Sequence, residues 1–166
     1  MTFRPVVSTQ LVITTTLALV VLLALGILFL VLQHQTRDRA SVHYSFLFAG
    51  CLMIFLVAGS FSFRIRSYEI NSGNLVVHVG FGKKIFPLNG LQNVSLEERP
   101  FAGATKDAAM AGIWSYCGIF SSQKFGTFHA YATTPAQGAL LTWADKKVLV
   151  TPDDTTRFMQ SLKPAP

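Results

Sequence analysis

The chain has 166 residues, of which 51% are hydrophobic and 13% are charged, and its mean hydropathy is +0.43. An ordinary soluble domain carries about 25% charged residues, so this composition favours a membrane protein with at most one modest domain outside its spans. The net charge of +6 is lower than a nucleic-acid binder of this size concentrates on one face. Two cysteines, Cys51 and Cys117, exclude a disulfide framework or a metal cluster.

Two charge-free runs in the N-terminal third predict membrane spans. Residues 11–32 comprise 22 residues, 18 of them apolar, and residues 44–63 comprise 20 residues, 15 of them apolar. At about 1.5 Å per residue the first run is about 33 Å long, which suffices for a hydrocarbon layer of about 30 Å. The short polar link predicts a helical hairpin, because lipid tolerates only helices or closed barrels. A cleavable signal peptide is the alternative for the first run, but the run is longer than such a signal and no A-x-A-like site follows it.

Arginines near the ends of these runs predict the orientation of the hairpin. Arg4, Arg64 and Arg66 flank one side, and Arg37 and Arg39 lie in the link. Lys and Arg accumulate on the cytoplasmic side of a membrane. We therefore expect both termini in the cytoplasm and the chain in a bacterial inner membrane, as a multi-pass protein.

The remaining residues, 64–166, are expected to form one small domain that follows the second run without a linker. Turn-forming residues at 71–74 and 80–84 separate short alternating runs, which are typical of strands. A segment from 99 to 123 has no clean period. Near the end, the sequence TPDD at 151–154 predicts a helix that starts with a Thr N-cap and a proline in its first turn. About seven strands followed by one helix favour a partly open barrel plugged by that helix.

One stretch of this domain resembles a known family. The glycine-and-aromatic run at 112–120 (GIWSYCGIF) precedes the strand at 125–133 (FGTFHAYAT), and TPDD precedes the last helix. This order is similar to that of the bacterial pleckstrin-homology-like (PH-like) domain family, in particular its membrane-tethered members, over residues 66–163. The resemblance implies a membrane α-helical hairpin followed by a mainly-β PH-like barrel with one C-terminal helix. It implies no fixed ligand and no catalysis. The expected organisation is a cytoplasmic N-terminus (1–10), the hairpin (11–63) and the PH-like domain (64–166).

Candidate chemical motifs in the sequence do not combine into a site. Residues 80–84 (GFGKK) resemble part of a phosphate loop but lack its first glycine and its Ser or Thr, which favours a hairpin turn. The four histidines have no ligand spacing. Glu97 and Glu98 are adjacent on a strand and point to opposite faces. Cys117 has no catalytic partner at a recognisable spacing, as expected of an inert buried thiol. We therefore expect no catalytic residue, no cofactor and no metal.

Six aromatic residues within 112–131 leave two interpretations open. In the first, all six fill the interior of the barrel, as buried aromatics ordinarily do. In the second, Trp114, Tyr116 and Phe120 form a protruding interaction surface, because such residues anchor protein interfaces. Phe128 and Tyr131 fall on opposite faces of one strand, which leaves open that one of them lies outside the core.

Three functional classes follow. The sequence favours a non-catalytic, membrane-anchored interaction module, an accessory or assembly subunit whose partners are membrane lipids and a membrane protein complex or a second copy of the chain. The alternative is a sensor of anionic lipid headgroups that uses Arg64, Arg66, Lys83 and Lys84, although such readers cluster about 4–8 cations. An enzyme has the least support. The spans contain no Asp, Glu, Lys, Arg or His, which argues against a transporter.

Overall fold

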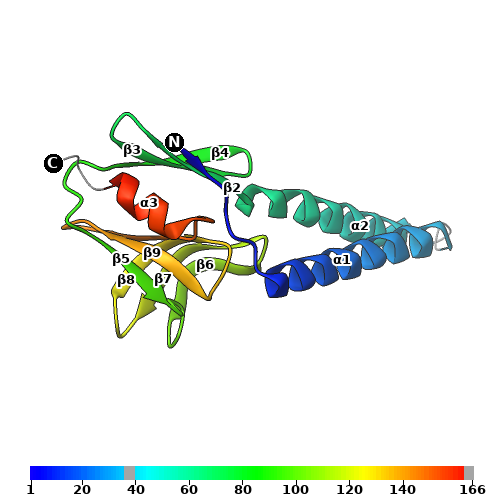
Figure 1. The fold of residues 1–166 in the computed structure, drawn as a ribbon. Coiled ribbons are helices and arrows are strands. Elements are labelled where there is room, and N and C mark those ends of the chain that lie inside the picture. The colour runs from blue at the N-terminus through cyan, green and yellow to red at the C-terminus, as the bar shows by residue number, and fades with distance from the viewer. Residues whose placement is uncertain (36–39, 163–166) are drawn as a thin grey trace.

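The computed structural model describes residues 1–35 and 40–162. Two helices, α1 (Thr9–Gln35) and α2 (Ala40–Ser60), lie side by side as an antiparallel hairpin that projects from a mainly-β domain (Figure 1). A short 3-10 helix, η1 (Phe61–Phe63), connects α2 to the domain. The predicted order of a helical hairpin, a mainly-β domain and a C-terminal helix is confirmed.

The hairpin is apolar over most of its length. Thr9–Leu32 and Tyr44–Phe63 are long and apolar enough to cross a membrane, and most of their side chains are exposed rather than packed inside the protein. The side chain of Leu30 packs against Gly50 of the neighbouring helix, so a small residue lets the two helices approach closely. Arg37 and Arg39, on which the predicted orientation depends, lie outside the described residues.

The domain consists of two sheets and one helix. The described residues contain ten strands, of which nine follow residue 64, where about seven were predicted, and all neighbouring strands are antiparallel except β8 and β10. The first sheet has the order β1 (Thr2–Phe3), β2 (Ile65–Asn71), β3 (Asn74–Val79), β4 (Gly82–Pro87). The second has the order β5 (Asn93–Glu98), β9 (Gln137–Thr142), β10 (Lys147–Val150), β8 (Gly126–Ala132), β7 (Ser115–Ser122), β6 (Thr105–Ile113), and α3 (Thr155–Leu162) follows.

The segment without a clean period is a hairpin of two strands, β6 and β7. Its register shifts twice, between Lys106 and Ala108 and again between Ala111 and Ile113. Each shift moves the following side chains to the other face of the sheet. The alternation that marks a strand in a sequence is therefore interrupted within a few residues.

Both faces of the six-stranded sheet are buried. On one face, Tyr131 belongs to the core between the two sheets, which Phe158 of α3 completes. On the other face, Phe128 belongs to a second cluster with Phe120 and Phe125. Phe128 and Tyr131 point in opposite directions, as their spacing predicts, yet both are buried because each face of the sheet has its own core.

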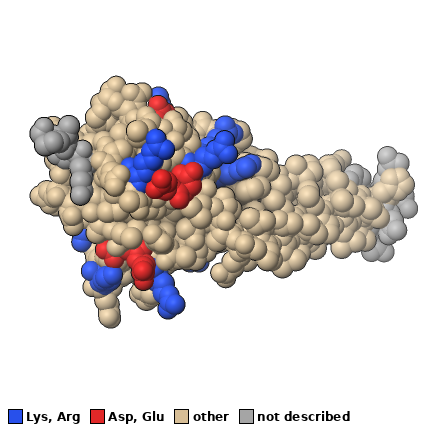
Figure 2. All heavy atoms as spheres, in the orientation of Figure 1, with Lys and Arg blue, Asp and Glu red and all other residues tan. Residues whose placement is uncertain are grey.

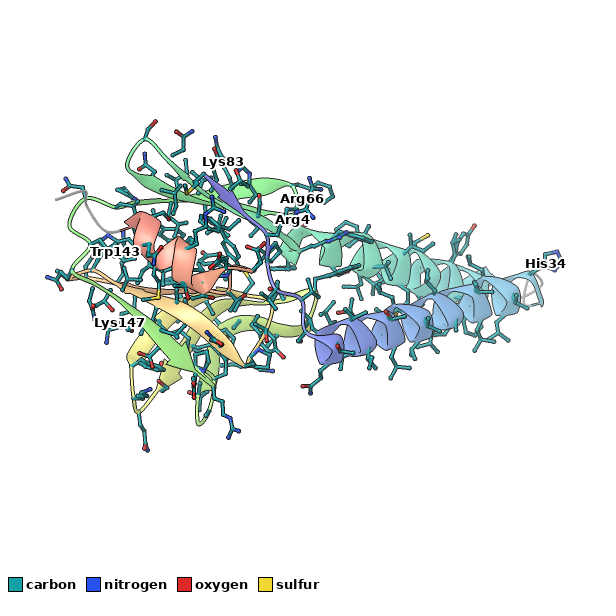
Figure 3. The ribbon with its side chains drawn as sticks, viewed as in Figure 1. Arg4, His34, Arg66, Lys83, Trp143 and Lys147 are labelled. Carbon is teal, nitrogen blue, oxygen red and sulfur yellow. The ribbon has the colours of Figure 1, made fainter. Side chains whose placement is uncertain are left out.

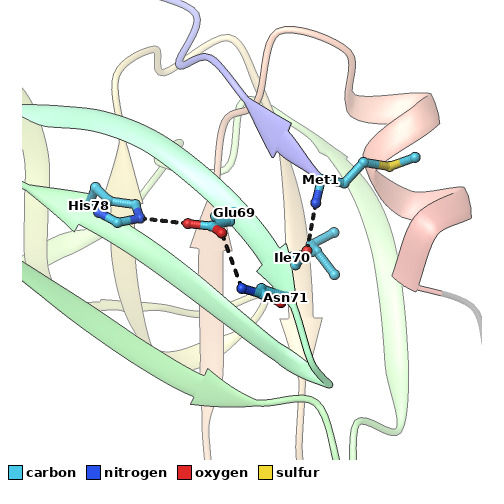
Figure 4. Close-up of polar contacts among 5 residues, drawn as sticks. All are labelled: Met1, Glu69, Ile70, Asn71 and His78. Atoms are coloured by element: carbon cyan, nitrogen blue, oxygen red, sulfur yellow. Dashed lines mark hydrogen bonds and ion pairs between the residues drawn. The ribbon is translucent and has the colours of Figure 1, made fainter.

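The N-terminal segment is part of the mainly-β domain. Strand β1 pairs with β2, the ring of Phe3 packs edge-on against Phe158 at 5.2 Å, and the Met1 ammonium group donates a hydrogen bond to the Ile70 carbonyl oxygen at 2.8 Å (Figure 4). Residues 1–8 therefore form part of the same body as the chain after residue 64. The two ends of the helical hairpin enter one domain, so both ends lie on the same side of the hairpin.

The C-terminal helix starts later than its sequence suggests. The Asp154 carboxylate accepts a hydrogen bond from the Arg157 amide at 2.9 Å and so acts as the N-cap. Thr151, the predicted cap, is instead buried, and its amide donates to the hydroxyl of Tyr68 at 3.3 Å. Pro152 forms an isolated bridge with Pro5. Within TPDD, Thr151 is therefore part of the core, and Asp154 caps the helix.

Candidate functional site

The turn between β6 and β7 reaches the place where α1 and η1 join the domain. Trp114 is the single residue between the two strands, and its φ is +62°. A left-handed backbone costs a non-glycine residue about 1–2 kcal/mol, and such a conformation persists only where surrounding contacts impose it. We call residues 112–115 the junction turn, and their contacts identify what imposes this backbone.

The backbone of the junction turn is bonded to the first turns of α1. The Trp114 amide donates a hydrogen bond to the Thr15 hydroxyl oxygen at 2.9 Å. The Thr14 hydroxyl lies 3.0 Å from the carbonyl oxygen of Gly112 and 2.9 Å from that of Gln10 in its own helix. Both of these threonines of α1 therefore form hydrogen bonds to the domain, and Thr14 also bonds to its own helix.

The side chains of the junction turn contact the end of the second helix. The Trp114 indole N–H donates to the Ser60 hydroxyl at 3.0 Å, and its ring packs against Phe61 with 4.8 Å between centroids. The Arg64 guanidinium lies 5.5 Å from the centre of the indole ring, within the range of a cation–π contact. The Ser115 hydroxyl donates to the Phe63 carbonyl oxygen at 2.6 Å. The junction turn therefore connects both helices to the domain.

The three aromatic residues predicted to protrude have different positions. Phe120 is only 2% exposed and belongs to the second core cluster, so it does not form part of a surface. Tyr116 is half-buried against Phe101 with 5.0 Å between ring centroids, and this burial raises the pKa of its phenol. Trp114 is held by the helix ends. The structure does not bring the three together as an exposed patch, because Phe120 lies in the second core, Tyr116 packs against that core and Trp114 packs against the helix ends.

The four basic residues predicted to contact lipid lie on two strands, Arg64 and Arg66 at the start of β2 and Lys83 and Lys84 on β4. Figure 2 shows Lys and Arg side chains where the hairpin joins the domain, whereas the described part of the hairpin, outside the grey tip, shows no charged side chain on the visible face. Arg64 and Arg66 are exposed at the start of β2. Lys83 and Lys84 are neighbours on β4, opposite His78 and Val77 respectively, and so face opposite sides of the sheet. They do not act as a pair. Figure 3 shows Arg66 near Arg4, with Lys83 farther along the domain.

The turn between β3 and β4 contains Gly80 and Phe81, and the sequence analysis did not single out Phe81 as a candidate. Gly80 lies against Ser62 of η1, where a side chain on Gly80 would overlap the Ser62 backbone, and its amide donates to the Arg64 carbonyl oxygen at 2.7 Å. The next residue, Phe81, is 82% exposed. The sequence signal that could have identified Phe81 is its position between two glycines of a predicted turn, because an aromatic side chain in a turn is expected to be exposed.

Several ionisable groups of the domain have structural partners or lie in the core. The Glu69 carboxylate lies 3.0 Å from the His78 ring nitrogen, and this hydrogen bond, the largest of the lowering contributions, lowers the pKa of Glu69 (Figure 4). Burial raises the pKa of Tyr68 to about 12, and its hydroxyl donates to the Tyr131 carbonyl oxygen at 2.7 Å. Burial also raises the pKa of Cys117. Among the described residues, no group of three or more His, Cys, Asp or Glu side chains is arranged to hold a metal ion.

These features define a class of protein, a mainly-β domain of the pleckstrin-homology type fixed to the end of an apolar helical hairpin. The chain belongs to the family described as "Bacterial PH domain", whose sequence profile matches residues 66–165. The match begins just after the hairpin, so the N-terminal strand and both helices are outside it. No curated protein and no solved structure matches the chain.

Proposed function

We propose that this chain is a non-catalytic, membrane-anchored interaction module that holds its PH domain in one orientation and presents it to a partner protein. The observation that supports this proposal is the junction turn, in which Trp114 contacts the beginning of α1 and the end of α2. A domain on a flexible linker samples many orientations. A domain fixed to both ends of a hairpin offers the same surfaces at the same height above a membrane, which lowers the entropic cost of binding a partner.

The edge of the first sheet is the surface that we propose for the partner. Strand β4 is an edge strand in the described part of the chain, and Ile85 on its outer face is 51% exposed. In an antiparallel ladder, alternate residues turn their backbone groups outward. The Leu88 amide bonds to the Gly73 carbonyl oxygen at 2.8 Å, so the outward positions on β4 fall at Lys83 and Ile85. An extended segment of a partner can add to such an edge through backbone hydrogen bonds.

Lysine on this edge also limits unspecific pairing. Edge strands in native proteins carry charges that keep a second sheet from adding unselectively. Lys83 has this position, next to the exposed apolar side chain of Ile85. The combination favours a partner segment with an acidic residue beside an apolar one.

The test compares two matched substitutions in the full chain, purified in mild detergent from its native membranes. Ile85→Arg places a charge on the β4 edge, and Leu96→Arg places the same charge on β5, an edge strand of the other sheet whose Leu96 is 47% exposed. We expect proteins that co-purify with the parent chain to be lost from Ile85→Arg and retained by Leu96→Arg. Retention by both variants, or loss from both, would contradict the proposed surface.

A second candidate function, contact with anionic lipid headgroups, is favoured by Phe81. This residue is largely exposed beside η1, and Arg64 and Arg66 lie at the same end of the domain. At a membrane surface, apolar side chains such as Phe enter the boundary between headgroups and acyl chains, and cations are attracted to anionic headgroups. In bilayer nanodiscs containing lipids brominated near the headgroup, the fluorescence that Phe81→Trp adds to that of the parent chain should be quenched more strongly than the parent fluorescence, which comes from Trp114 and Trp143. Equal quenching of the added and the parent fluorescence would contradict this placement.

A further inference from the structure

We propose that a pocket beside α1 binds one anionic glycerophospholipid, with Arg66 as the principal ligand of its phosphate. The inference rests on the lipid-contact candidate above and adds a defined site, ligand class and geometry to it. It does not depend on the β4 edge, so the two can fail separately.

The pocket lies in the corner between the N-terminal segment, α1 and the start of β2. Its volume is about 490 Å³, which is within the range of small-molecule sites. The N-terminal segment contributes Pro5 and Val7, and the indole of Trp114 forms part of the wall. Because the junction turn holds Trp114 and the hydrogen bond from Ser8 to Thr133 holds the N-terminal segment, the walls are fixed before any ligand arrives.

The lining changes from cationic to apolar along the helix axis. Arg64 and Arg66 line the end nearest the domain, and Leu19 lines the far end. Val12, Thr16 and Leu19 have the spacing of one helix face, and seven residues of helix cover about 10 Å. A candidate span begins at Thr9 and the other ends at Phe63, so this gradient lies across the level at which headgroups give way to acyl chains.

Arg66 has no ion-pair partner among the described residues, and its backbone lies in a bulge of β2. The register between β2 and β3 shifts between Ile65 and Ser67, which makes Arg66 the extra residue of a bulge. Bulges commonly re-aim a side chain, and here Arg64, Ile65 and Arg66 all line the same pocket. Within residues 1–35 and 40–162, neither ion pair involves an arginine and no acid partners Arg66.

This chemistry matches a phosphodiester that carries acyl chains. A guanidinium group binds two phosphate oxygens at once, and it does so strongly where no carboxylate competes. A choline headgroup would place a third cation next to two arginines, which favours anionic lipids such as phosphatidylglycerol. A second, apolar pocket of about 370 Å³ lies between the two helices and shares Leu19, so apolar surface for a chain continues beyond the first pocket.

The experiment titrates the delipidated full chain with phosphatidylglycerol or phosphatidylcholine and counts bound lipid by native mass spectrometry. Arg66→Gln removes the phosphate ligand. Val12→Trp fills the apolar half, and Lys83→Gln is the control, a cation outside the pocket. We expect one tightly bound phosphatidylglycerol in the parent chain and in Lys83→Gln. In Arg66→Gln we expect a loss of affinity of about tenfold or more, as for a charged hydrogen bond. Val12→Trp should also lose the lipid, while circular dichroism melts match the parent.

Each other outcome would contradict the proposed lipid site, and these outcomes can be distinguished from one another. Equal, salt-sensitive losses in Arg66→Gln and Lys83→Gln would mean diffuse attraction to headgroups, which leaves the lipid-contact candidate standing without a site. Equal affinity for the two lipids would exclude an anionic ligand. Displacement by soluble glycerol phosphate at the same concentration would show that acyl chains contribute nothing. If none of the proteins retains lipid, the site is absent, whatever the result at β4.

Discussion

Replacing Trp114 with alanine should loosen the junction between domain and hairpin without unfolding the domain. The indole contacts Ser60, Phe61 and Arg64, all of which belong to the end of the second helix or follow it directly. Trp114 belongs to neither of the two buried core clusters. Its removal therefore affects the attachment of the domain more than its interior.

The magnitude follows from the contacts that are lost. A hydrogen bond contributes about 1 kcal/mol, an aromatic pair about 0.5–1.5 kcal/mol, and an exposed cation–π contact about 0.5–1 kcal/mol. The junction should thus weaken by about 2–3.5 kcal/mol. Alanine keeps the unfavourable positive φ of residue 114, whereas glycine relieves it by about 1 kcal/mol. The expected order of junction stability is parent, then Trp114→Gly, then Trp114→Ala.

Hydrogen exchange of the residue 114 amide measures the junction, because in the parent this amide donates to the Thr15 hydroxyl. Its exchange should accelerate by about 30- to 300-fold in Trp114→Ala, at about 1.4 kcal/mol per tenfold. Trp143 is then the remaining tryptophan. It is 6% exposed and donates to the Pro87 carbonyl oxygen, so its fluorescence reports unfolding of the domain core and should change little.

A matched control is Phe81→Ala, which removes an exposed aromatic ring from the neighbouring turn and should alter neither readout. The reasoning is refuted if the Trp143 unfolding midpoint falls as far as the junction does, because Trp114 would then be part of the core. It is equally refuted if exchange at residue 114 stays at the parent rate, or if glycine is worse than alanine.

Three further predictions concern the core, a pair of glycines and the topology. The folded-state pKa of Tyr68 is raised to about 12, so the stability from keeping this phenol neutral is fully present below its ordinary value near 10. It is lost as the pH rises toward 12, by about 2.7 kcal/mol; urea titrations across this range should show that Tyr68→Phe abolishes this part of the slope. Gly118→Ala should destabilise the domain by about 2 kcal/mol or more in thermal melts, because its Cβ would overlap the Ala108 carbonyl at a φ of +132°. Gly126→Ala, also at positive φ but in open space, should cost about 1 kcal/mol. Reporter fusions should be active in the cytoplasm after Pro166 and in the periplasm within the link; a periplasmic signal at the C-terminus would reverse the predicted orientation.

The sequence by itself was sufficient to predict the helices and strands that depend on neighbouring residues in the chain. The runs at 11–32 and 44–63 become helices because a long apolar stretch without charges has few other ways to satisfy its backbone. The hairpins around residues 71–74 and 80–84 follow from turn residues between alternating strands. The C-terminal helix follows from its cap and its one-sided apolar stripe, although the cap is Asp154 rather than Thr151. The resemblance to the PH-like family rested on the glycine-and-aromatic segment at 112–120, and the family match over residues 66–165 confirms it.

The candidate site depended on contacts that no local pattern encodes. Trp114 bonds to Thr15 across 99 residues and to Ser60 across 54, and two register shifts hide the strand that carries it. The sequence therefore left open whether these aromatics fill the interior or protrude, whereas folding brings Trp114 to the helix ends and buries Phe120 in a second core. In the same way, the bulge at Arg66 in β2 and the place of Arg66 beside α1 are known only from the tertiary structure. Composition and periodicity determined which segments are helices and strands. The tertiary structure decided which residues meet, because side chains distant in the chain become neighbours only when both sheets and the hairpin pack together.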